Sequence, residues 1–131
     1  MAEEAPHTQD ENPFLSTPSY VDKASKEVGK QDYNGLCQGF VDTMTGNPNR
    51  YKSAVEAWNG QLNKAHGGLE GIRSGDLLYF NPDASNRDDG HTGIYIGNGQ
   101  FVSATDYGVK TENVSDWMKK TGQKVLGYIR K

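Results

Sequence analysis

The sequence has little of several features that define whole classes of protein. It contains a single cysteine, Cys37, so no disulfide can form within the chain and the core alone must hold the fold together. No apolar run approaches the roughly 18 residues that a membrane-spanning helix needs. The chain begins with acidic Glu3 and Glu4, without the basic start and apolar stretch of a secretory signal. We therefore expect no membrane-spanning helix, no disulfide scaffold and no Sec-type signal.

A strong charge of one sign is also missing from most of the chain. The net charge is −3, but residues 1–19 hold four acidic and no Lys or Arg side chains, which leaves 13 acidic and 14 basic ones in residues 20–131. Residues 110–131 carry six bases and two acids. An excess of this size suits a polyanion such as nucleic acid or a wall polymer, but lysine-rich helix ends are usually only solvated. We expect no nucleic-acid partner and no membrane partner.

The length of 131 residues suits one domain with one core. Residues 1–16 are polar, contain Pro6 and Pro13, and have too little apolar surface to offset the entropy lost on ordering. They are predicted to be a flexible leader or linker. The folded domain is predicted over residues 17–131.

Two kinds of periodicity divide this domain. Apolar residues at helical spacing, with capping residues before them, come first, and short apolar runs of β type follow. Helices followed by an antiparallel sheet indicate the α+β class. The predicted helices cover residues 18–29, a segment from Cys37 to a stop at residues 46–48, and residues 53–60 and 114–121. The predicted strands cover residues 76–80, 91–96, 100–104 and 124–129.

The single thiol falls in the first turn of a predicted helix. The free N–H groups and the positive dipole end at that position lower a thiol pKa and favour a nucleophile. Cys37 also shares a helical face with Phe40 and Val41, however, which is typical of a small buried apolar residue. Position alone leaves both interpretations open. Gly35 favours the nucleophile, because a glycine there allows a close approach of backbone or substrate.

One of the three histidines is placed for catalysis. His7 and His66 fall in predicted loops, whereas His91 opens a strand directly after a polar loop. A sheet can anchor such a side chain while it reaches a cleft. A cysteine at a helix start and a histidine on a facing strand form the general-base arrangement of thiol proteases.

Three segments of the chain then show a resemblance. Residues 35–41, 73–80 and 91–104 resemble, in order and spacing, the three signature blocks of the NlpC family of papain-like cysteine peptidases, which are related to CHAP amidases. The resemblance implies a papain-like fold with N-terminal helices packed on an antiparallel sheet. It also implies hydrolysis of an amide bond in bacterial peptidoglycan, with Cys37 as nucleophile, His91 as base and no cofactor.

The sequence departs from the family pattern at three places. Leu-Cys-Gln-Gly replaces the usual Asp-Cys-Ser-Gly, the paired glycines that often precede it are missing, and the residue that should orient the imidazole, commonly histidine, is Ser103. If the hairpin turn has two residues, Asp106 faces His91, and if it has three, Ser103 lies diagonally on the same face. The family alignment favours Ser103, while the charge of a carboxylate favours Asp106. We rank Ser103 first and keep Asp106 as its rival.

Other site residues are predicted with alternatives beside them. Backbone N–H groups of Cys37 and Gln38 are expected to form the oxyanion site. Gln31 has the offset of an oxyanion glutamine, although a loop glutamine is more often polar surface. The aromatic candidates for substrate binding are Tyr33, Trp58 and Tyr107, with core packing as the alternative for Trp58.

A metal site is not expected. Asp83, Ser85, Arg87 and Asp89 alternate as calcium ligands do, but the arginine stands in the middle position and the loop lacks a glycine in the right place.

The combined prediction is a cysteine hydrolase of bacterial peptidoglycan. The alternatives are an inactive wall-binding module on the same scaffold, and a related acyltransferase or antibacterial effector. A small domain without a signal suggests, by analogy, a phage enzyme released from the host cytoplasm by a holin, or a wall hydrolase carried on the virion. Such a chain would be a monomer or a domain of a larger virion protein.

Overall fold

The computed structural model describes residues 17–48, 50–82 and 89–131. The predicted leader and the loop residues Asp83, Ser85 and Arg87 lie outside these ranges. Within them, no helix is both long and apolar enough to cross a bilayer.

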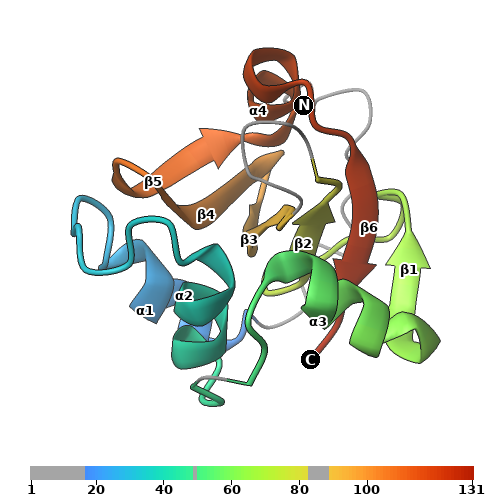
Figure 1. Ribbon diagram of the computed structural model, residues 1–131, viewed down its shortest axis with the longest axis horizontal. Helices are drawn as coiled ribbons and strands as arrows, with labels where there is room; N and C mark the ends of the chain where they lie inside the picture. Colours follow the sequence, from blue (N-terminus) through green and yellow to red (C-terminus); the bar gives the residue numbers. More distant parts are fainter. Residues whose placement is uncertain (1–16, 49, 83–88) are drawn as a thin grey trace.

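Six antiparallel strands form one sheet in the order β1-β6-β2-β3-β4-β5 (Figure 1). From β2 to β5 each strand pairs with the next one in the chain, and β6 returns from the C-terminal end to lie between β1 and β2. The strands are β1 (Ala65–Gly67), β2 (Leu77–Phe80), β3 (His91–Gly97), β4 (Gln100–Thr105), β5 (Gly108–Asn113) and β6 (Val125–Ile129).

Helices cover both faces of this sheet. In Figure 1, α1 to α3 gather on one side and α4 lies on the opposite side. A short 3-10 helix, Leu62–Lys64, leads from α3 into β1. The helices are α1 (Ser19–Ser25), α2 (Cys37–Met44), α3 (Ala54–Gly60) and α4 (Val114–Thr121).

Strand β2 shows how the two faces are used. Successive side chains of a strand point to opposite faces. Leu77 and Tyr79 therefore pack with the α1–α3 layer, and Leu78 and Phe80 pack with the α4 side. All four residues of β2 are buried, which explains the unbroken apolar run in its sequence.

The predicted α+β order is confirmed, with differences at particular elements. The first helix ends at Ser25 and gives way to turns before Gly29, whose φ is 97°. The Ser53 hydroxyl caps α3, since the Glu56 N–H donates to Ser53 Oγ at 3.2 Å. Strands β1 and β5 were not predicted.

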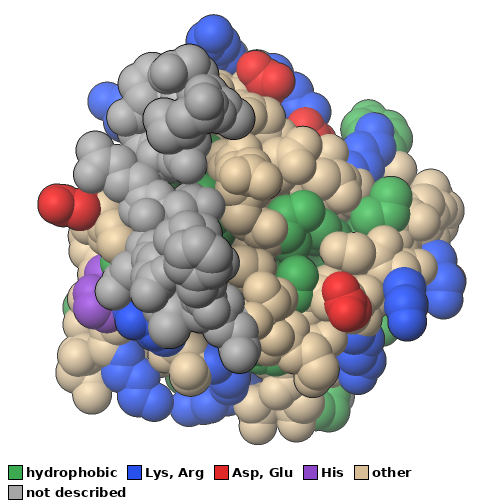
Figure 2. Space-filling view, turned by 180° about the vertical axis from the view of Figure 1, so that it is seen from behind, with side chains coloured by type: hydrophobic (Ala, Val, Ile, Leu, Met, Phe, Trp, Pro, Cys, Tyr) green, Lys and Arg blue, Asp and Glu red, His purple; other side chains and the backbone are tan. Residues whose placement is uncertain are grey.

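Basic side chains are spread over the surface. In Figure 2, Lys and Arg lie around the edge of the face seen from behind, with a few acidic side chains between them and apolar side chains nearer the centre. They form no single continuous patch on the visible, described part of that face.

Candidate active site

A cavity of about 480 Å³ opens at the end of the sheet where β3 begins and β4 ends. Its lining includes Cys37 from α2 and His91 from β3. The remaining lining comes from both sides of the sheet, through the turn after β4, through β5 and through α4. The cavity therefore joins the two predicted catalytic residues although their elements lie far apart in the sequence.

Cys37 is the first residue of α2, as predicted. The backbone N–H groups of Thr92, Gln38 and Cys37 itself bond the sulfur and lower the thiol pKa, but burial outweighs them and raises that pKa to about 11. The N–H groups at the helix start therefore lower the thiol pKa as expected, but the loss of solvation on burial is the larger effect, so the net shift is upward. To form a thiolate at neutral pH, Cys37 therefore needs a nearby base that takes its proton and whose protonated, cationic form then stabilises the thiolate.

A chain of buried polar contacts holds the start of α2. Tyr79 donates its hydroxyl to Gln38 Oε1 at 3.2 Å, and Gln38 donates from Nε2 to Asp42 Oδ1 at 2.8 Å. The Tyr51 N–H donates to the other oxygen of Asp42 at 3.0 Å. Gln38 is only 3% exposed. The glutamine that departs from the family pattern is therefore the link between α2 and β2.

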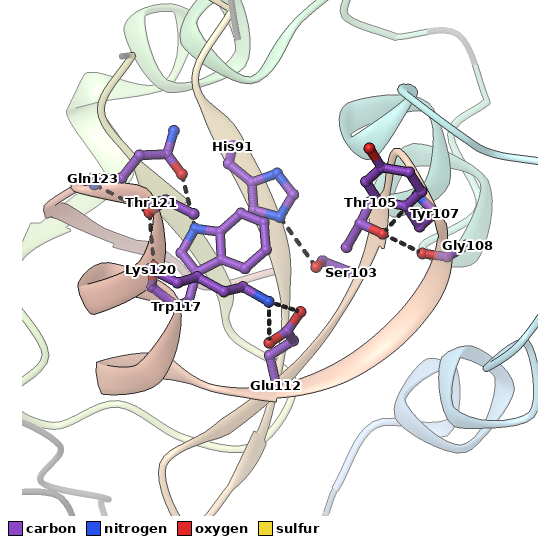
Figure 3. A network of polar contacts seen from close by, with 10 residues as sticks. All are labelled: His91, Ser103, Thr105, Tyr107, Gly108, Glu112, Trp117, Lys120, Thr121 and Gln123. Carbon is purple, nitrogen blue, oxygen red and sulfur yellow. Dashed lines mark hydrogen bonds and ion pairs between the residues drawn. The ribbon is translucent and has the colours of Figure 1, made fainter. Parts of the chain in front are cut away.

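His91 lies on the opposite face of the sheet and is 7% exposed. Its Nε2 is 3.0 Å from Ser103 Oγ (Figure 3). The indole of Trp117 on α4 stacks on the imidazole with 4.2 Å between ring centroids and 20° between planes. Phe80 and Phe101 complete an aromatic surround at 6.0 and 6.3 Å.

The hairpin register explains why Ser103 reaches His91. The turn is the two-residue Asn98-Gly99, since Gly97 pairs with Gln100, and by itself this length would have favoured Asp106. An irregularity between Tyr95 and Gly97 then shifts the pairing by one residue. Gly97 has a φ of 97°, which suits a bulge.

The shifted register brings Ser103 next to Gly93. A Cβ at Gly93 would lie 2.8 Å from Ser103 Cβ, so glycine there keeps the space beside the histidine open. Asp106 instead lies in the turn after β4, where its Oδ1 would be 3.5 Å from a Cβ on Gly35. It lines the cavity from the side of Cys37.

The structure separates the aromatic candidates. Tyr107 is 77% exposed and lines the cavity. Tyr33 packs edge to face on Phe40, with 5.2 Å between ring centroids, and does not line the cavity. Trp58 lies 5.6 Å from Tyr79 in the same core layer and is also absent from the lining.

Gln31 lies outside the cavity lining as well. Its Nε2 donates to the Tyr107 carbonyl at 3.3 Å, and its Oε1 accepts from Asn34 at 2.6 Å. These contacts fasten the loop before Cys37 to the turn after β4.

Sequence reasoning did not single out several cavity residues, among them Lys110, Glu112, Trp117 and Lys120. Lys110 pairs across the sheet with Ser103, so both side chains lie on the face of His91. Lys120 Nζ is 2.9 Å from Glu112 Oε2. Among the described residues Lys110 makes no ion pair. The sequence signal for strand β5, which carries Lys110 and Glu112, was weak because its polar residues resemble those of a loop.

The described ranges contain no group of three His, Cys, Asp or Glu side chains placed to hold a metal ion. Of the four loop positions considered for calcium, only Asp89 is described.

The sequence profile of the NlpC/P60 family matches residues 23–126. The chain belongs to the NlpC/P60 family. Members of this family are typically cell-wall peptidases. This NlpC/P60 chain also has the α+β fold of two solved structures from Trichomonas vaginalis, NlpC1 and NlpC2, with TM-scores of 0.58 and 0.63 and identities of 22% and 19%. The match covers 85% of this chain in both cases, and 42% and 44% of those chains.

Curated relatives are longer proteins. The chain is 41% identical over 58 residues to the probable endopeptidase p60 of Listeria seeligeri, covering 43% of this chain and 10% of the relative. It is 43% identical over 60 residues to the protein of the same name from Listeria monocytogenes serovar 1/2a, covering 44% and 11%. The match thus spans about a tenth of the length of these relatives.

Proposed function

We propose that this NlpC/P60 domain is a cysteine peptidase that hydrolyses an amide bond of bacterial cell-wall peptides. The proposal rests above all on one observation, that Cys37 at the start of α2 and the Ser103-bonded His91 line the same cavity. Family membership and the endopeptidase name of the Listeria relatives support the substrate class.

The proposed chemistry begins with transfer of the thiol proton from Cys37 to Nδ1 of His91. The thiolate attacks the substrate carbonyl, and the N–H groups of Cys37 and Gln38 stabilise the oxyanion. The imidazolium protonates the leaving amine, which leaves a thioester on Cys37. His91 then activates water, which hydrolyses this acyl-enzyme. In this scheme, the contact of Ser103 Oγ with Nε2 holds the imidazole ring so that Nδ1 faces Cys37.

The cavity wall suits a peptide with charges of both signs. Lys110 and Asp106 are separate charged side chains in the lining, and Tyr107 offers an exposed aromatic face. Cell-wall stem peptides carry both carboxylates and amines. Of the aromatic candidates, we propose only Tyr107 for substrate contact, since Tyr33 and Trp58 pack in the core layer.

Digestion of purified peptidoglycan tests the proposal. Wild-type protein should release soluble fragments cut at one kind of amide bond, identified by mass spectrometry, and Cys37→Ala should release none. Release that survives Cys37→Ala would contradict the proposal. Binding to the wall by both proteins without release would indicate a wall-binding module, and amine-capped products would indicate an acyltransferase.

The flexible leader over residues 1–16, the release through a holin and the carriage on a virion stay predictions from the sequence.

A further inference from the structure

The imidazole of His91 is held from two directions. Ser103 Oγ meets the ring edge at Nε2, 3.0 Å away, and the Trp117 indole covers one ring face with 4.2 Å between centroids (Figure 3). The first contact fixes a point on the ring, and the second fixes the plane of the ring. Stacked rings so close to parallel cannot rotate independently about a single hydrogen bond.

A serine does not by itself meet two requirements of a catalytic histidine. A hydroxyl both donates and accepts, so it does not select one imidazole tautomer, and it carries no charge to stabilise the imidazolium. The negative face of an indole attracts a cation held over it. The stacked face of Trp117 can therefore stabilise the imidazolium form of His91, which the uncharged hydroxyl of Ser103 does not do.

Trp117 is itself held firmly. It is 8% exposed, and its Nε1 donates to Gln123 Oε1 at 2.8 Å. Gln123 Nε2 in turn donates to the carbonyl of Asn81 at 2.8 Å, which links α4 to the end of β2. The Lys120 ammonium is 5.2 Å from the indole ring, but the bidentate contact with Glu112 offsets its charge.

We propose that Trp117 is a positioning residue for the Cys37–His91 pair, which fixes the plane of the imidazole and stabilises its protonated form. This inference rests on the proposed function, in which His91 takes the proton of Cys37. Charged and titratable groups that share the cavity with His91 come from every surrounding element. They are Cys37 of α2, Asp89 before β3, Asp106 and Tyr107 after β4, Lys110 and Glu112 of β5, and Lys120 of α4.

The test measures alkylation of the single thiol by iodoacetamide as a function of pH, which needs no substrate. In the wild type, imidazolium formation should allow rapid alkylation near pH 7, far below the thiol pKa of about 11. Trp117→Leu should lower the alkylation rate at pH 7 about tenfold, because the imidazolium of His91 loses the aromatic face that stabilises it. The rate above pH 11 should stay unchanged, because the thiol then ionises without help from the imidazole. Trp117→Phe should restore most of the rate.

Val114→Ala is the matched control. Val114 is buried in the same helix and the same core cluster but does not line the cavity. It should lower thermal stability and leave the pH profile of alkylation unchanged. A folded Trp117→Leu protein with the wild-type profile would overturn the inference. A slow rate at pH 7 in the wild type, equal to that of His91→Asn, would instead overturn the proposed function.

A second measurement leaves Trp117 in place. In a Trp58→Phe background, Trp117 is the only tryptophan, and an imidazolium stacked on it should quench its fluorescence. The emission should fall as His91 becomes protonated, and His91→Asn should abolish that titration. Emission that does not titrate with His91 would overturn the inference even if Trp117→Leu fails to fold.

Discussion

The thiol and the imidazole come from opposite faces of one sheet, and the two faces are built differently. On the α2 face, Cys37 directly precedes Gln38, which belongs to a buried polar chain with Tyr79 and Asp42. On the α4 face, His91 lies among the rings of Phe80, Phe101 and Trp117. Each face thus holds one of the two proposed catalytic residues by a different kind of contact.

This difference separates the expected effects of substitutions. Buried hydrogen bonds are costly to break, because the groups left behind lose their partners. Changes in the polar chain should therefore act mainly on stability. Changes around the imidazole should act mainly on proton transfer, since Ser103 and the aromatic rings contact the side chain proposed as the base.

The largest effect is expected at His91. His91→Asn removes the base and should lower the rate of amide hydrolysis about 10³-fold, within the usual range for general acid–base catalysis. Initial rates on a purified muropeptide measure this change, with thermal unfolding as the check on folding. A loss below tenfold in a folded variant would show that another group takes the thiol proton.

The next effect is expected on the other face. Asp42→Ala leaves the Gln38 amide and the Tyr51 N–H without their acceptor and should lower the free energy of unfolding by about 3 kcal/mol. Urea denaturation measures the change. An Asp42→Ala protein as stable as the wild type would mean that the polar chain does not hold α2.

Ser103 and Asp106 compare the two candidates for the orienting role. Ser103→Ala should lower kcat about tenfold, the cost of one lost hydrogen bond, while Asp106→Asn should stay within about twofold. Steady-state kinetics on the same muropeptide separate the two variants. The reverse order would return the role to Asp106.

The smallest effect is expected at the cavity rim. Lys110→Gln should raise KM about threefold for a peptide with a free carboxylate and leave kcat unchanged, as for an exposed ion pair. Lys119→Gln is the matched control, because Lys119 is exposed on α4 outside the cavity lining. Equal KM values for both variants would exclude a carboxylate contact at Lys110.

The sequence was sufficient for the order of elements and for the position of Cys37 and His91. Both residues stand at the start of a strongly patterned helix or strand, and local pattern predicts such positions well. Strand β5 escaped prediction because its polar residues face a cavity and not a core, and Lys110 was missed with it.

The remaining differences arise from tertiary structure. The sequence left the turn length open, and the observed two-residue turn would by itself place Asp106 opposite His91. The bulge before Gly97, which brings Ser103 to that face instead, depends on how β3 and β4 pack. The thiol pKa rises because the fold buries Cys37, which its place in a helix did not reveal. The stacking of Trp117 on His91 joins residues 26 positions apart through two packed elements.

The most direct test of the central claim is the pH profile of Cys37 alkylation in the wild type and in His91→Asn. A thiol without the imidazole should become reactive only as the pH rises through its own pKa of about 11, because the thiolate is the nucleophile. We predict a midpoint near that value for His91→Asn and one several units lower for the wild type. A wild-type midpoint near 11 would contradict the account, since it would show that the imidazole from one face does not activate the thiol from the other.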